Sequence, residues 1–197
     1  SGAERVLIDL AERVHMPVVN TPTSRSAVPE THPLVMGPSG IVGYEPVGDA
    51  IREADMILAI GSRLSDLQTA RGDLLPDRIP IVQVDIDPAA VGRNHDVTVG
   101  IVADARSFAE ALNETLTENP IDVPDARRDW TDGLSARISS WPLAGFDAMP
   151  DNGKVQPQEV CQSMMTLPPE TIYTHGAGDH GFYGYMVPVA TPGAHLV

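Results

Sequence analysis

The spacing of apolar residues along the first 119 positions alternates between helix-like and strand-like patterns. Apolar residues at helical spacing predict helices over Ala3–His15, over Val47–Ala54 and from Ala105 to Leu116. Short, continuously apolar runs between these helices predict strands at Met16–Asn20, Met56–Gly61, Ile79–Asp87 and Val97–Val102. Strands that are apolar on both faces are typical of parallel sheets covered by helices on each side. The pattern therefore predicts an α/β fold with a doubly wound, mostly parallel sheet, a Rossmann-like domain.

The remaining segments predict the domain organisation. Prolines and glycines crowd Thr21–Glu45, which we expect to be a long loop. A surface helix is expected over Asp125–Trp141, and a new β/α pattern follows with a helix at Gln158–Leu167 and a strand at Thr171–Gly176. We expect a central α/β domain at 1–119, a linker with the surface helix at 120–152 and an incomplete second α/β unit at 153–197.

The composition excludes several classes of partner. The chain has 13 basic and 27 acidic residues and a formal net charge of −14. Such a charge repels phosphate, so neither nucleic acid nor a membrane surface is an expected partner. No apolar run approaches the roughly 20 residues that a bilayer requires. Cys161 is the single cysteine of the sequence, which excludes an intrachain disulfide and favours a reducing, cytoplasmic location.

Ligand chemistry is expected at the carboxyl ends of the strands, where doubly wound sheets bind their ligands. Gly61 and Arg63 follow one strand, and exposed backbone N–H groups beside a guanidinium suit a phosphate. Asp85 and Asp87 end another strand, where a carboxylate can accept hydrogen bonds from ribose hydroxyls. Gly40 lies in a Gly-rich stretch whose backbone could closely approach a bound group. The alternative for each segment is that glycine and aspartate only close tight turns.

A further Gly-rich turn lies near the end of the sequence. The run 176–181 (GAGDHG) follows a predicted strand and precedes a predicted helix, so an anion could bind at that helix N-terminus, or the run could be only a tight turn. The six histidines show no metal-ligand spacing, and neither a nucleophile elbow nor a P-loop is present. We therefore expect no metal ligand and no catalytic residue in this chain, and we predict that Cys161 is a buried structural thiol.

In this order, the segments resemble a known family. The resemblance rests on VPETHPL at 28–34, ADMILAIGSRL at 54–64, VDIDPAAVGRN at 84–94 and VGIVADA at 99–105. This series resembles the central domain of thiamine-diphosphate-dependent enzymes, in particular their acetolactate synthase-like branch, over residues 1 to about 118. Residues 153–197 resemble the opening of the diphosphate-binding domain of that family.

The resemblance implies an enzyme of three α/β domains that decarboxylates 2-keto acids or joins the product to a second carbonyl. Thiamine diphosphate with Mg²⁺ would supply the chemistry. The implied partners are the remaining domains of the same enzyme, further copies in a homo-oligomer (dimer or tetramer) and a small 2-keto acid. The resemblance implies that the cofactor diphosphate is contacted by Gly178, Asp179 and His180. It also implies that a crevice for FAD or ADP in the central domain is lined by Gly40, Gly61, Arg63, Asp85 and Asp87.

Two functional hypotheses follow from the resemblance. The sequence lacks the activating Glu of the family and the G-D-G…N-N segment that holds Mg²⁺ and the diphosphate. The first hypothesis is therefore a fragment of a carboligase or decarboxylase that is inactive alone, with its central domain acting as a scaffold. The alternative is a stand-alone nucleotide- or flavin-binding module without catalysis. Leu67 stands where flavin-binding members carry a second Arg, which counts against FAD.

Overall fold

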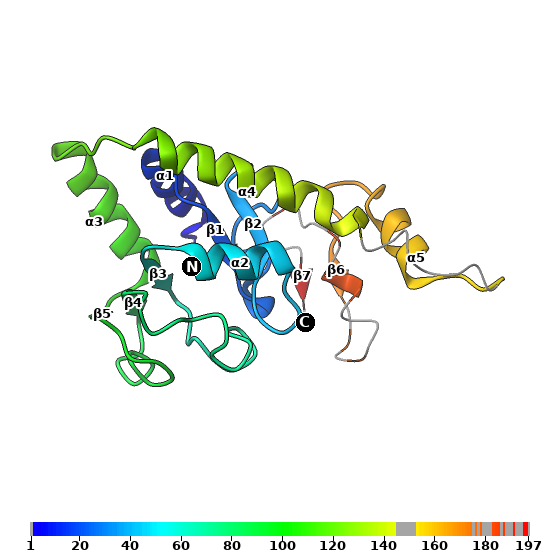
Figure 1. The fold of residues 1–197 in the computed structure, drawn as a ribbon, viewed down its shortest axis with the longest axis horizontal. Helices are drawn as coiled ribbons and strands as arrows, with labels where there is room; N and C mark the ends of the chain where they lie inside the picture. The colour runs from blue at the N-terminus through cyan, green and yellow to red at the C-terminus, as the bar shows by residue number, and fades with distance from the viewer. Residues whose placement is uncertain are drawn as a thin grey trace.

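The fold is taken from a computed structural model of the 197-residue chain (Figure 1). It describes residues 2–144, 153–174, 176, 178, 183–185, 187, 191 and 195–196. In the view of Figure 1, strands β3 (Ile57–Ile60), β4 (Ile81–Asp85) and β5 (Val99–Val102) lie on one side of the molecule. Strands β1 (Val18–Asn20) and β2 (Val35–Pro38) lie in the middle, and helix α5 (Pro157–Met164) and strand β6 (Tyr173–Thr174) lie on the other side. The chain thus folds into successive groups of helices and strands.

All the described strand pairs are parallel, as the apolar runs predicted. Strands β3 (Ile57–Ile60), β4 (Ile81–Asp85) and β5 (Val99–Val102) form one sheet in that order. Its register pairs Ile60 with Val84, so the carboxyl ends of β3 and β4 lie at the same edge. The mostly parallel α/β fold is therefore confirmed.

A second pair of parallel strands includes one that the sequence pattern did not predict. Strand β1 (Val18–Asn20) pairs with β2 (Val35–Pro38), which lies inside the segment that we expected to be a loop. That expectation is wrong at these four residues, all of which are buried. The strand could not be predicted from the local sequence, because Gly37 and Pro38 ordinarily mark turns. Its extended conformation comes from pairing with β1 and from burial in the core.

The helices pack against one another and against the strands. Helix α1 (Glu4–Val14) packs against α3 (Ala105–Glu118), while α2 (Glu45–Glu53) packs against α4 (Asp125–Ala144), the long helix at the top of Figure 1. One apolar cluster joins β2, α2 and α4 and consists of Met36, Tyr44, Val47, Ala50, Leu134 and Ile138. Helix α4, which was expected to be a surface helix, therefore buries one stripe of its surface against β2 and α2.

The C-terminal part carries a second, smaller α/β pattern. It contains α5 (Pro157–Met164) and the parallel strands β6 (Tyr173–Thr174) and β7 (His195–Leu196). Cys161 is buried against Val187, which confirms the predicted buried thiol. Burial raises the pKa of this thiol, so it is less reactive than a free cysteine.

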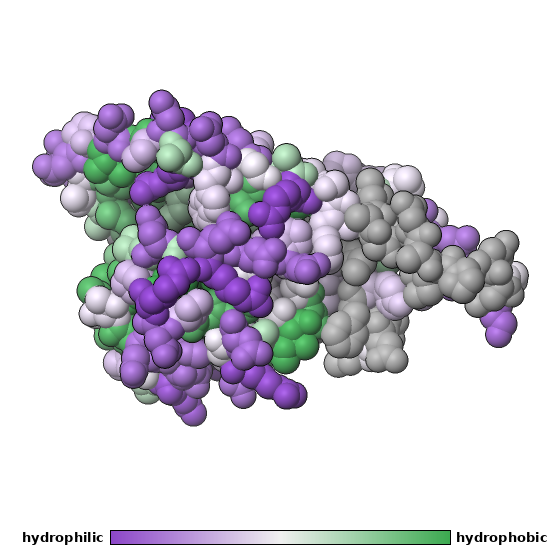
Figure 2. Space-filling model, viewed as in Figure 1, coloured by the Kyte–Doolittle hydropathy of each residue, from purple (hydrophilic) through white to green (hydrophobic). Residues whose placement is uncertain are grey.

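The surface is mainly polar in the view of Figure 2, where hydrophilic residues cover most of the described face and apolar residues form smaller patches. Within the described residues, every helix is too short or too polar to span a bilayer.

Candidate functional site

The strand register brings two of the predicted site segments together. Gly61 follows β3 and its N–H donates a hydrogen bond to the carbonyl of Val84 at 2.8 Å, which continues the sheet beyond Ile60. Asp85 is the last residue of β4 and therefore lies beside Gly61 at the same sheet edge. The predicted proximity of these two strand ends is what a parallel register requires.

The loop after β3 is held in place by a buried glutamine that sequence reasoning missed. The Gln83 side chain lies inside β4, where the residue is 1% exposed. Its Nε2 donates to the carbonyls of Ser62 at 2.9 Å and Ala90 at 3.3 Å, and its Oε1 accepts from the N–H of Gly92 at 2.8 Å. Gln83 thus connects the loops that follow β3 and β4. Its signal in the sequence is a single polar residue inside the apolar run IVQVD.

Arg63 lies on this loop with its guanidinium exposed. The carbonyl of Arg63 accepts a hydrogen bond from Asn94 Nδ2 at 2.7 Å, so its backbone is fixed. Among the described residues, the guanidinium makes no hydrogen bond or ion pair. Gly61, two positions earlier, has open space where a Cβ would lie. This edge of the sheet therefore offers an exposed cation on a fixed backbone, which is chemistry suited to an anionic group.

Gly40 follows β2, a strand of the other sheet, and lies against the loop after β3. The N–H of Ile41 donates to the carbonyl of Leu67 at 3.0 Å, and Ser39 Oγ donates to the carbonyl of Gln68 at 3.1 Å. Gly40 has a φ of +87°, and a Cβ there would lie 2.0 Å from the Leu67 oxygen. Contact between the two loops is therefore sufficient to explain a glycine at this position.

Asp85 and Asp87 make the hydrogen bonds of a tight turn. Asp85 Oδ1 accepts from the N–H of Asp87 at 2.9 Å, and Asp87 Oδ1 accepts from the N–H of Ala89 at 2.9 Å. Such local bonds are typical of aspartates that end strands. Each carboxylate has further acceptor capacity, because an ionised carboxylate can accept about four hydrogen bonds.

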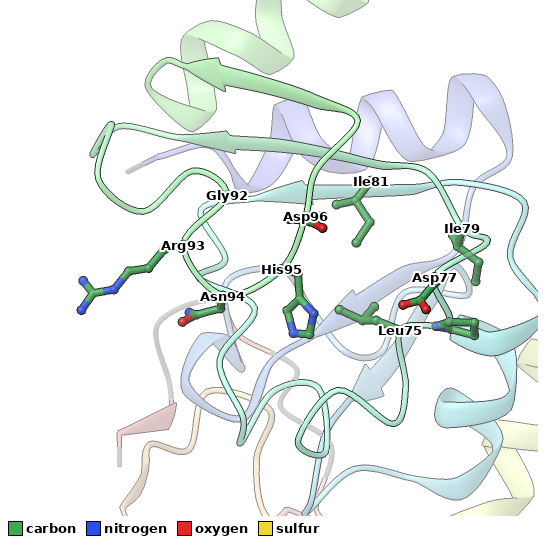
Figure 3. Close-up of a pocket in the computed structure, with 10 residues that line it drawn as sticks. Leu75, Asp77, Ile79, Ile81, Gly92, Arg93, Asn94, His95 and Asp96 are labelled. Carbon is green, nitrogen blue, oxygen red and sulfur yellow. The ribbon is translucent and has the colours of Figure 1, made fainter.

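The cavity at this sheet has a volume of about 450 Å³ and lies away from the predicted residues. It is lined by residues from the two connections that flank β4 and by Ile79 and Ile81, near the start of that strand (Figure 3). His95 and Asp77 are drawn beside the cavity, whereas Arg93 extends away from the other labelled side chains. None of the predicted site residues lines it.

The second predicted site is only partly described. Gly178 is an exposed bend residue. Asp179 and His180 lie outside the described residues. In the part of the chain that the structure covers, no three His, Cys, Asp or Glu side chains are arranged to hold a metal ion.

Sequence reasoning also missed a buried charged pair in the Pro-rich segment. Arg25 Nε donates to Glu30 Oε1 at 2.7 Å, and Arg25 Nη2 donates to Glu30 Oε2. Asn20 Nδ2 donates to the same carboxylate at 3.2 Å. The side chains of Arg25 and Glu30 are 0% and 3% exposed. Burial by itself would lower the pKa of Arg25, but the hydrogen bond and the charge of Glu30 outweigh burial and leave that pKa raised.

Comparison with known proteins finds relatives over most of the chain. A family model described as the central domain of thiamine pyrophosphate enzymes matches residues 1–112. The acetolactate synthase large subunit of Corynebacterium glutamicum is 34% identical over 181 residues, which are 91% of this chain and 28% of the relative. A probable acetolactate synthase large subunit of Methanocaldococcus jannaschii is 32% identical over 85% of this chain and 27% of its own length. An acetolactate synthase of Mycobacterium leprae is 30% identical over 90% of this chain and 28% of its own length. The chain thus spans less than a third of the length of these relatives.

Proposed function

The chain belongs to the thiamine pyrophosphate (thiamine diphosphate) enzyme family through its central domain at residues 1–112, and from this we propose that it is part of an acetolactate synthase-like 2-keto acid carboligase or decarboxylase. Thiamine diphosphate with Mg²⁺ supplies the carbanion chemistry in the complete enzyme. The proposal assigns residues 1–119 to the central domain, 120–152 to the linker and 153–197 to the start of the diphosphate-binding domain. Small 2-keto acids are the proposed substrates.

Within that enzyme, the central domain acts as a scaffold. The observation that carries this role is the set of hydrogen bonds by which Arg25 and Tyr44, both in the central domain, contact Gly184, Tyr185 and Val187. The proposal further assigns the diphosphate contacts to Gly178, Asp179 and His180, and it includes a homo-oligomeric assembly with the remaining domains.

The 197-residue chain is proposed to be inactive by itself. The test is an assay of this chain with pyruvate, thiamine diphosphate and Mg²⁺, in parallel with the polypeptide that carries the chain in the cell, isolated through an affinity tag at its gene. We expect the complete polypeptide to release CO₂ from pyruvate, and we expect no release by the isolated 197-residue chain. Turnover by the isolated chain would contradict its proposed inactivity. A complete polypeptide that consumes no 2-keto acid would contradict the proposed activity.

A second candidate is the binding of FAD or ADP at the edge formed by Gly61, Arg63 and Asp85. The exposed guanidinium of Arg63 beside the open space at Gly61 favours an anionic ligand there. A ligand at one hundred times its dissociation constant stabilises a protein by about 2.7 kcal/mol. We expect such a shift for the isolated chain with ADP or FAD if the site binds either one, and its loss in Arg63→Ala but not in Arg71→Ala, an exposed control. A chain that neither ligand stabilises would leave the central domain as a scaffold alone.

A further inference from the structure

The buried ion pair of Arg25 and Glu30 also contacts a turn near the other end of the chain. Arg25 Nη1 donates to the carbonyl of Gly184 at 3.2 Å, and Nη2 donates to the carbonyl of Val187 at 2.9 Å. The guanidinium carbon lies 5.6 Å from the centre of the Tyr185 ring, within range of a cation–π contact. One guanidinium therefore holds a carboxylate of the central domain and two carbonyls of the C-terminal part at the same time.

Tyr44 makes a third bond to the same turn. Its Oη donates to the carbonyl of Tyr185 at 2.7 Å. Burial raises the pKa of Tyr44, an effect that outweighs the opposing charge of Arg25, so the phenol stays protonated and remains a donor. We call Arg25, Glu30 and Tyr44 the Arg25 cluster.

Within the second α/β unit, the turn is attached to α5. Cys161 Sγ donates to the carbonyl of Tyr183 at 3.2 Å, and Val187 packs against Cys161 of α5. The turn thus lies between the Arg25 cluster on one side and α5 on the other. A buried charge that loses its partners is strongly unfavourable, so Arg25 resists any movement that takes the carbonyls away.

We propose that Arg25 is a positioning residue, which together with Glu30 and Tyr44 fixes Gly184, Tyr185 and Val187 to the central domain and so orients the start of the cofactor-binding unit. Its part in cofactor binding rests on the proposed function. The hydrogen bonds go to backbone carbonyls, so they depend on the path of the main chain at the turn.

The direct test is amide hydrogen exchange of the 197-residue chain. The single variant Arg25→Met would leave the Glu30 carboxylate buried without the positive charge of Arg25, and such a loss can prevent folding. The double variant Arg25→Met/Glu30→Gln removes both charges, keeps the volume and retains an acceptor for Asn20. We expect the exchange rate of the Val187 amide to rise at least about tenfold in the double variant, and to rise less in Tyr44→Phe, with the protection of α1 and α3 unchanged.

A matched control is Arg137→Met/Asp49→Asn, which removes an exposed ion pair between α4 and α2, its atoms 3.2 Å apart. This control should leave the exchange of Val187 unchanged. If exchange in the double variant rises equally at all amides, or not at all at Val187, Arg25 has no positioning role and the inference is wrong.

A second readout concerns the cofactor in the complete polypeptide. We expect the double variant to bind thiamine diphosphate about tenfold more weakly, with nearly unchanged turnover at saturating cofactor. An unchanged affinity would overturn the role in cofactor orientation. If the wild-type polypeptide itself shows no dependence on thiamine diphosphate, the proposed function fails, while the exchange experiment still decides whether Arg25 positions the turn.

Discussion

The Cα of Gly40 lies so close to Leu67 that a Cβ on residue 40 would be 2.0 Å from the Leu67 carbonyl oxygen. At this contact the loop after β2 packs against the loop after β3. Gly40 also has a φ of +87°. The neighbouring backbone cannot move aside as a flexible side chain would.

Gly40→Ala should therefore be strongly destabilising. We expect the free energy of unfolding to fall by roughly 3 kcal/mol, because the new methyl group both strains the backbone and overlaps the Leu67 carbonyl. Urea unfolding of the 197-residue chain measures this change. A loss below about 1 kcal/mol would show that the two loops are not in contact.

Gly133→Ala offers the opposite outcome at another glycine. Gly133 lies in the middle of α4, is exposed, and has open space where a Cβ would lie. Alanine is the better helix former by about 0.5–1 kcal/mol, so we expect the free energy of unfolding to rise by that amount. Destabilisation in the same urea titration would contradict the helical geometry at this position.

Gln83→Leu should separate the loops after β3 and β4. The substitution leaves the carbonyls of Ser62 and Ala90 and the N–H of Gly92 without their partner, and we expect a loss of about 2–4 kcal/mol in the free energy of unfolding. The control is Gln162→Leu on the exposed face of α5, which should change stability by less than about 0.5 kcal/mol. Equal effects of the two substitutions would refute the bridging role of Gln83.

Asp104 caps α3 and should make the stability of this helix depend on acid pH. Its Oδ1 accepts from the N–H groups of Arg106 at 3.0 Å and Ser107 at 3.1 Å. The hydrogen bond from the Ser107 backbone, supported by that from Arg106, lowers the pKa of Asp104 below its ordinary value of 3.8. The folded state therefore favours the ionised carboxylate. Its stabilising contribution is present above the ordinary value and is lost as the pH falls through the lowered pKa.

We expect Asp104→Ala to lower the melting temperature at neutral pH, and Asp104→Asn to lower it less, because Asn retains a cap acceptor. The difference between wild type and Asp104→Asn should shrink as the pH falls below about 4. Thermal unfolding followed by circular dichroism, from neutral pH down to acid pH, measures this difference in melting temperature. A difference that stays constant down to pH 2 would argue against an ionised cap.

Local spacing was sufficient to predict most helices and five of the strands, β1, β3, β4, β5 and β6. The apolar runs at Ile57–Ile60 and Ile81–Asp85 are strands in the structure, as predicted, and the ends of the helices differ from prediction by a few residues. The proximity of Gly61 and Asp85 also followed from the sequence, because consecutive parallel strands end at the same edge. Strand β2 did not, since Gly37 and Pro38 read locally as turn residues.

Periodicity and composition alone thus determine the parallel α/β class, because helices and buried strands are encoded by side chains that are neighbours along the chain. The tertiary structure decided which polar groups are buried and what they hold. Gln83 interrupts an apolar run in a way that can be seen in the sequence, but its three partners become visible only when the loops have folded over it. Arg25 meets Glu30 five positions away, yet it contacts carbonyls 159 and 162 positions away. No local pattern specifies such a contact, because the position of a carbonyl group depends on the path of the main chain and not on the identity of its side chain.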